Sequence, residues 1–259
     1  MRKGADLVNG EFINVRVSDD SMVKLEYHER LDSVVSLARE HAQNGYPDRY
    51  AVLAEYDGTH EADGKGLYMS LILRPSIFPS QAGLLSSLSA VALTLALDEH
   101  TTKKLGIGWV SNLYCDGKYI GGVTIEGKLD DFTSYEYIII NFAVKLTKDD
   151  FPNRITDLIK KVFESDNTSV AVIIARTLLS KFFPLYRDMK NPGKFMNKYK
   201  ERFALGGVKI KHIVDGKKTT CKALGVNPTD CSLIVETRKK HIVHITKQNS
   251  VIIPKAIKK

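Results

Sequence analysis

The sequence predicts an α/β protein in the broad sense, with a mixed β-sheet flanked by helices and a small β-barrel after it. Apolar runs of strand length alternate with stretches of helical periodicity through the first two hundred residues. From Val208 onward the apolar residues recur with a period of two. Residues 190–259 hold 17 basic and 4 acidic residues, a net charge of +13, whereas residues 1–189 sum to −5. These observations predict two domains, 1–204 and 205–259.

Each element of the first domain follows from its pattern of apolar residues. Met22–Tyr27 alternates between apolar and polar residues, as a half-buried strand does. The apolar positions of Leu31–Gln43 have the spacing of one helix face, and Asp32 or Ser33 can cap its start. Tyr50–Tyr56 is mostly apolar, which is typical of a central strand. The other predicted elements are strands at 67–74, 105–110, 113–115, 119–126 and 135–146, and helices at 82–97, 155–164, 170–183 and 194–203.

Composition excludes several classes of protein. The longest apolar run, Ala82–Leu97, is short for a membrane span and contains serines and a threonine, so we expect a buried helix. No apolar stretch follows the first basic residues, so no secretory signal is expected. Cys115, Cys221 and Cys231 lack metal-ligand spacing, which favours buried or free thiols and a reducing, cytoplasmic compartment. We therefore expect neither a metal site nor a membrane partner.

The second domain is predicted from short alternating segments at 208–214, 221–226, 232–237 and 241–246. Its many lysines have two interpretations: a solvated surface, or a surface that binds polyanions. No aromatic residue follows Phe203, so bases could not stack there. Nucleic-acid binding, if it occurs, would be nonspecific contact with phosphates.

The segment Gly108–Glu126, GWVSNLYCDGKYIGGVTIE, resembles the central motif of biotin protein ligases, K-W-P-N-D-L-Y followed by K-L-A-G-I-L-x-E. The residues in register with it are Trp109, Leu113, Tyr114, Gly122 and Glu126. Further similar strings are Glu29–Ser33 (ERLDS), Ala54–Tyr56 (AEY) before the adenylate loop, and Leu67–Pro75 (LYMSLILRP). From Gly206 the chain resembles the SH3-like domain of the same family. The chain is thus identified as a divergent member of the biotin/lipoate ligase superfamily.

The resemblance implies a reaction, ligands and partners. These ligases join biotin to ATP as an acyl adenylate, with Mg, and pass the acyl group to a lysine of a biotin-carrier-type protein. Members often dimerise through the central sheet, so a homodimer is a further expectation. The positions expected near a ligand are Ser33, Asp57, Gly58, Thr59, His60, Trp109, Asn112, Gly121 and Gly122.

The residues that carry the chemistry depart from the family pattern. Adenylate formation needs cations near the phosphates and a loop that excludes water. The loop Asp57–Gly66 is shorter than the family's G-R-G-R-R-G loop, and its three acidic residues face only Lys65. Val34-Val35 replaces Thr-Asn, and Tyr119 stands where a lysine is expected. Other replaced positions are Gly108, Val110, Ser111 and Asn112 for Lys, Pro, Asn and Asp, and Asn141–Lys145 for Gly-Ile-Gly-Ile-Asn.

Three functions therefore compete. The first is a degenerate homologue that binds a small acyl ligand or a protein partner without adenylation. The second is an active ligase in which Lys118 is the catalytic cation, which requires a β-bulge that Gly121-Gly122 could host. The third is nonspecific nucleic-acid binding by the basic domain. Two residues also keep two interpretations: Trp109 stacks on a ligand or packs in the core, and Cys115 accepts an acyl group or is a buried thiol.

Overall fold

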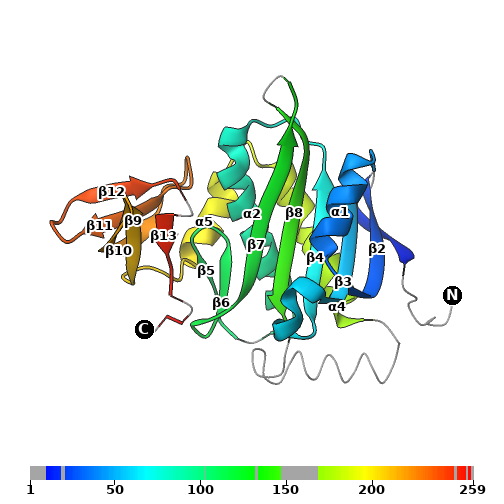
Figure 1. Cartoon of the computed structure of the whole chain (residues 1–259), viewed down its shortest axis with the longest axis horizontal. Coiled ribbons are helices and arrows are strands. Elements are labelled where there is room, and N and C mark those ends of the chain that lie inside the picture. Colours follow the sequence, from blue (N-terminus) through cyan, green and yellow to red (C-terminus); the bar gives the residue numbers. More distant parts are fainter. Residues whose placement is uncertain are drawn as a thin grey trace.

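The computed structural model describes residues 10–18, 21–101, 103–131, 134–146, 169–247, 250–254 and 256–257, without the side chains of residues 18 and 61–63. These residues form two β-sheets. The larger sheet and its helices make up the body of the molecule, and the smaller sheet lies at the end farthest from the N-terminal strands (Figure 1). The predicted helix at 155–164 lies outside the described residues.

The larger sheet has eight strands in the order β1-β2-β3-β4-β8-β7-β6-β5. Their bounds are β1 Glu11–Ser18, β2 Ser21–Leu31, β3 Tyr50–Asp57, β4 Gly66–Leu73, β5 Leu105–Gly108, β6 Asn112–Cys115, β7 Lys118–Leu129 and β8 Tyr135–Lys145. Strands β2 and β3 pair in parallel and the other neighbours are antiparallel, so the predicted mixed sheet is confirmed.

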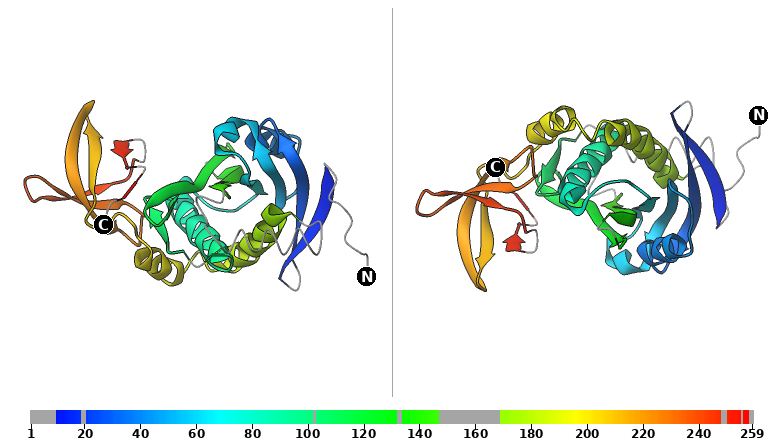
Figure 2. Two further views of the ribbon diagram at one scale, coloured as in Figure 1. Left: turned by 90° about the horizontal axis from the view of Figure 1, so that it is seen from below. Right: turned by 90° about the horizontal axis from the view of Figure 1, so that it is seen from above.

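Helices cover both faces of this sheet. They are α1 (Val34–Gln43), α2 (Ala82–Asp98), α4 (Val170–Arg187) and α5 (Gly193–Glu201), with short 3-10 helices η1 (Gly58–Asp63) and η2 (Pro79–Gln81). Figure 2 shows α1 on one side of the curved sheet and α2 and α4 on the other. Because side chains alternate along a strand, β3 packs Val52 and Ala54 against the α1 side and Leu53 against the α2 side. Burial on both faces explains why its sequence is a continuous apolar run.

Helix α2 confirms the prediction of a buried helix. The segment Pro79–Asp98 is long and apolar enough to cross a membrane, but 67% of it is buried inside the protein. Its hydroxyls are satisfied within the helix: Ser89 Oγ donates to the carbonyl of Leu85 and Thr94 Oγ1 to that of Ala90, each at 2.7 Å. These are the properties of a core helix in a folded domain.

The first strand was not predicted from the sequence. Ile13, Val15 and Val17 alternate and are buried, but Phe12 beside them is 53% exposed and obscures the period. Pairing with β2 along its length, Glu11 opposite Tyr27, stabilises this edge strand. A tertiary contact therefore decides the structure of a segment whose local pattern is ambiguous.

The smaller sheet is five-stranded and antiparallel, in the order β12-β11-β10-β9-β13. Its strands are β9 Lys209–Val214, β10 Lys217–Val226, β11 Leu233–Thr237, β12 Ile242–Ile245 and β13 Val251–Ile252. Four of them match the predicted segments, and β13 was not predicted. Within the described residues the edge strands β12 and β13 do not pair with each other, so the antiparallel sheet does not close and the predicted small β-barrel is not confirmed.

Specific hydrogen bonds fasten the smaller sheet to the body. Trp109 Nε1 donates to the carbonyl of Cys231 at 2.7 Å, and the Tyr114 hydroxyl donates to the carbonyl of Pro254 at 2.8 Å. Ser87 Oγ lies 3.3 Å from Cys231 Sγ. All three cysteines lie in the described part of the chain, are buried and form no disulfide, as their number and spacing predicted.

A buried carboxylate links α1 to the sheet. Glu26 on β2 is 8% exposed and accepts hydrogen bonds from the Tyr50 hydroxyl (2.5 Å), His28 Nε2 (2.8 Å) and His41 Nε2 (2.9 Å). Tyr46 stacks on the His41 ring at 4.0 Å. Burial alone would raise the pKa of Glu26, but the three donors outweigh it and hold the pKa below the ordinary value of 4.5. The charged carboxylate is therefore the form that joins β2, β3 and α1.

This network predicts a pH-dependent contribution to stability. Because the folded state lowers the pKa of Glu26, its contribution is complete above pH 4.5 and is lost as pH falls through the lowered value. We expect Glu26→Gln to reduce the free energy of unfolding at pH 7 by about 2 kcal/mol, the usual size for hydrogen bonds to a charged group. Urea unfolding at pH 7 and in a series of buffers below pH 4.5 should show the difference from wild type shrinking. Glu40→Gln, at an exposed position of α1, is the control. A difference that is independent of pH would contradict the assignment.

Candidate functional site

A cavity of about 140 Å³ lies where strands β4, β6, β7 and β8 meet the start of α1 and η1. Its polar lining residues are Asp57, His60, Tyr68, Ser70, Asn112, Tyr119, Thr124 and Asn141. Its other lining residues are Val34, Val35, Met69, Gly122, Val123, Phe142 and Ala143. Four positions that the sequence predicted near a ligand, Asp57, His60, Asn112 and Gly122, are therefore brought together here.

Asp57 closes the N-terminal end of α1. Its Oδ2 accepts from the backbone N–H of Val34 (2.8 Å), and its Oδ1 accepts from the backbone N–H of Thr59 (2.8 Å) and from the Thr59 hydroxyl. Ser33 caps the same helix, because its Oγ accepts from the backbone N–H of Ser36 at 3.2 Å. A helix N-terminus can hold a bound anion. Here the protein's own carboxylate occupies that position.

Two further contacts order the cavity wall. The His60 ring stacks on Tyr68 with centroids 5.2 Å apart and planes inclined by 18°. Ser70 Oγ donates to Asn141 Oδ1 at 2.7 Å, and both residues are buried. That bond uses the carbonyl end of the Asn141 side chain, so its NH₂ group is the end left to bind a ligand. The wall therefore offers neutral donors and acceptors.

No lysine or arginine is among the described residues that line the cavity. Lys65, the basic residue of the neighbouring loop, is ion-paired with Glu55, a buried residue that also accepts from the Tyr27 hydroxyl at 2.9 Å. The side chains of residues 61–63 lie outside the described part. Among the described residues that line the cavity, Asp57 is the one carboxylate and none carries a fixed positive charge. These residues therefore do not fit a triphosphate.

The structure contains the bulge that the Lys118 hypothesis requires, but the bulge turns another residue inward. Tyr114 pairs with Tyr119 and Leu113 with Gly121, so Ile120 is the extra residue of β7. Tyr119 lines the cavity. Lys118 is exposed and lies outside it, forming a bridge to Ala256 in the C-terminal tail.

Other predicted ligand residues have structural roles. A Cβ on Gly58 would lie 2.8 Å from the carbonyl oxygen of Asp32, and one on Gly121, whose φ is +145°, would lie 2.0 Å from that of Ala143. Both glycines allow backbones to approach closely. Thr59 orients Asp57, as described above. Trp109 is 3% exposed, does not line the cavity and bonds to the smaller sheet, which corrects the ligand-stacking interpretation in favour of a core aromatic residue.

Some cavity residues were missed in the sequence. Ser70, Thr124 and Asn141 lie on three adjacent strands, and the register brings Asn141 opposite both of the others. Tyr119 was noticed only as the replacement of a lysine. The apolar runs of β4 and β8 predict buried strands, but only their pairing shows which polar residues meet.

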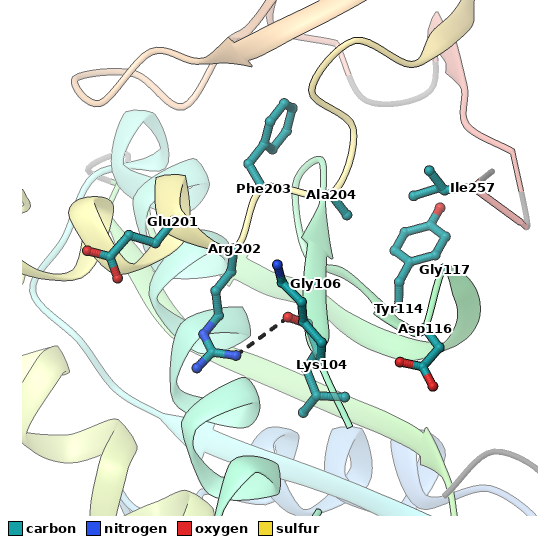
Figure 3. A pocket seen from close by; sticks show the side chains of 11 residues that line it. Lys104, Gly106, Tyr114, Asp116, Gly117, Glu201, Arg202, Phe203, Ala204 and Ile257 are labelled. Atoms are coloured by element: carbon teal, nitrogen blue, oxygen red, sulfur yellow. Dashed lines mark hydrogen bonds between the residues drawn. The ribbon is translucent and has the colours of Figure 1, made fainter. Parts of the chain in front are cut away.

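A second hollow, of about 250 Å³, lies between the sheet edge at β5 and β6, residues 201–204 and Ile257 (Figure 3). Two of its charged side chains, Arg202 and Asp116, are already engaged in ion pairs within the protein. Arg202 Nη1 donates to Asp98 Oδ1 at 3.2 Å and to the carbonyl of Leu105 at 3.5 Å, and Asp116 accepts from Lys103 at 2.6 Å. None of the predicted ligand residues lines it, so the smaller cavity beside α1 is the candidate site.

Comparison of the fold assigns the class of protein. A biotin protein ligase from Aquifex aeolicus, solved in complex with biotin and ATP, is 18% identical and superposes with a TM-score of 0.63, covering 88% of this chain and 97% of that one. A biotin protein ligase-like protein of unknown function from a Silicibacter species is 14% identical, with a TM-score of 0.63 over 86% of this chain and 94% of its own. The chain has the fold of biotin protein ligases.

Sequence comparison then assigns the family. The bifunctional ligase/repressor BirA of Bacillus subtilis (strain 168) is 28% identical over 229 residues, which is 83% of this chain and 70% of BirA. No known protein-family profile matches the chain. Its sequence homologues and its structural neighbours are biotin protein ligases, and the two comparisons together support the biotin ligase family for this chain.

The capping role of Asp57 can be tested by Asp57→Asn. An amide has one acceptor oxygen and no charge, so it cannot replace a carboxylate that accepts from Val34 and Thr59 at the helix N-terminus. We expect the free energy of unfolding, measured in urea, to fall by about 1–2 kcal/mol. Asp32→Asn makes the same change of charge at an exposed neighbouring position and should have little effect. Equal losses in the two variants would show that Asp57 does not stabilise α1.

Proposed function

We propose that this protein is a degenerate homologue of biotin protein ligases that no longer adenylates and uses its cavity to bind a small acyl ligand. One observation carries the proposal: no lysine or arginine is among the described residues that line the cavity, and its own Asp57 occupies the helix N-terminus. Formation of an acyl adenylate requires binding the triphosphate, offsetting the developing charge and retaining the anhydride. The family uses basic residues for these tasks, and the described lining of this cavity provides none.

Electrostatics decide against a triphosphate in this cavity. Two like charges 4 Å apart repel by about 4 kcal/mol at an effective dielectric constant of 20. A penalty of that size weakens binding by roughly a thousandfold, because each 1.4 kcal/mol is a factor of ten. A phosphate beside the Asp57 carboxylate would meet this repulsion without a compensating lysine or arginine in the lining.

The cavity suits a compact, uncharged ligand. Its volume of about 140 Å³ is below the roughly 300–1,000 Å³ of typical ligand pockets. Val34 and Val35 provide an apolar wall, while Asn112, Thr124 and Asn141 provide hydroxyl and amide groups. An acyl chain with a carbonyl or amide head group matches this combination.

Active ligation is the second candidate, and the relationship to BirA favours it. In that case biotin, ATP and Mg would be the ligands, a biotin-carrier-type protein would be the acceptor, and a homodimer through the central sheet would be the assembly. The exposed position of Lys118 outside the cavity supports the binding function instead. We further propose that residues 1–204 and 205–259 are separate domains, the second related to SH3-like barrels, and that the protein acts in the cytoplasm, since three cysteines without a disulfide suit a reducing compartment.

ATP–pyrophosphate exchange tests the proposal directly. With biotin, lipoate or octanoate supplied in turn, we expect no exchange above the acid-free background, because the described lining of the cavity offers no lysine or arginine to the phosphates. The Aquifex aeolicus ligase provides the positive control. Exchange stimulated by any one acid would overturn the proposal and identify the substrate, and its loss in Lys118→Ala would then assign the catalytic lysine.

Calorimetry without ATP tests ligand binding. Titration with the same acids and their amides should show binding of the neutral amide in preference to the charged acid, because Asp57 repels a carboxylate. Thr124→Val, at an exposed position of the wall, should weaken that binding by several fold through the loss of one hydroxyl. Lys118→Ala, outside the cavity, should leave it unchanged. Loss of binding in Lys118→Ala alone would place the ligand elsewhere.

A further inference from the structure

On the face of the smaller sheet that packs the core, the side chains change from apolar to polar along the strands. On β10 the buried Ala223 and Cys221 are followed, two residues apart, by Thr219, and on β11 the buried Val235 is followed by Thr237. Side chains two residues apart lie on the same face of a strand. Pairing places Cys221 opposite Thr237, so the polar residues gather at one end of the face that packs the core.

A hollow of about 370 Å³ lies at this polar end. Cys221 and Val235 are buried and form its apolar base, and Thr219, Thr220 and Thr237 add hydroxyls. Its charged or titratable lining residues are His212, Lys218, Arg238, Lys239 and His241. No carboxylate is among the described residues that line it.

The three fixed positive charges of the hollow have no partner within the described residues. Lys218, Arg238 and Lys239 are exposed, and none forms an ion pair with another described residue. Glu236, the acidic residue of β11, lies on the opposite face by alternation and pairs with Lys240 at 2.9 Å. The positive field of the hollow is therefore not neutralised from within this sheet.

We propose that this hollow binds a phosphate group, either of a small phosphate monoester or of a nucleic-acid backbone. An arginine fork with two lysines is a set of donors that matches phosphate oxygens. The Thr237 hydroxyl accepts from the backbone N–H of His241 at 3.1 Å and keeps its own proton to donate. No Phe, Tyr or Trp follows Phe203, so recognition rests mainly on contacts with phosphate and sugar. This binding is independent of the acyl-ligand cavity.

Fluorescence anisotropy with a labelled oligouridylate of about 20 nucleotides measures the binding. Neutralising three phosphates predicts a slope of about −2 in log affinity against log salt, or roughly 20-fold weaker binding on going from 50 to 200 mM salt. Competition with AMP and with inorganic phosphate distinguishes the sources. Displacement by millimolar AMP assigns the hollow to a phosphate monoester, and resistance to it assigns the hollow to a polynucleotide backbone.

A pair of matched variants decides whether the hollow is the site. Arg238→Ala/Lys239→Ala should weaken binding at least tenfold. Lys209→Ala/Lys211→Ala removes the same charge from exposed positions of β9 outside the hollow and should weaken binding less than twofold. Thr237→Val should weaken binding several fold with no change of charge, and Thr237→Ser should restore it. Absence of binding to all three phosphate probes, or equal losses in the two double variants, would overturn the proposal.

Discussion

The carboxylate of Asp57 joins the end of β3, the first turn of η1 and the first turn of α1. Its contacts with Val34 and Thr59 place three elements around one side of the cavity. Because a helix N-terminus attracts one negative charge, the same contacts exclude a second one. The interaction that stabilises this part of the fold is therefore also the one on which the proposed ligand preference rests.

The bulge in β7 is the second local constraint on the site. Ile120 is the extra residue between two paired positions, so the strand changes which side chains face the cavity. Tyr119 is turned toward the site and Lys118 toward solvent. Asp57 at the N-terminus of α1 repels an anion, and Tyr119 on β7 stands where the family resemblance implies a lysine. Both residues make the cavity less favourable for an anionic ligand. These two features are the basis for proposing a neutral ligand.

The two proposed binding sites differ in charge and lie in different parts of the molecule. The body carries the cavity, whose wall is neutral or acidic, while the smaller sheet carries a hollow lined by basic residues. Trp109 and Tyr114 hold the two parts together through backbone carbonyls of Cys231 and Pro254. Both aromatic residues are among those that resemble the family motif, and in this structure they have a structural role.

The sequence by itself determined the mixed sheet, the buried α2, four of the five strands of the smaller sheet and the resemblance to biotin protein ligases, because periodicity and short strings are local properties. It also shows other residues at the positions where the resembling motifs have lysine and arginine. Tertiary structure decided the rest. The edge strand β1 depends on pairing with β2, the orientation of Tyr119 depends on the bulge, and the union of Ser70, Thr124 and Asn141 depends on strand register. Long-range pairing sets which face each side chain occupies, and no local pattern contains that information.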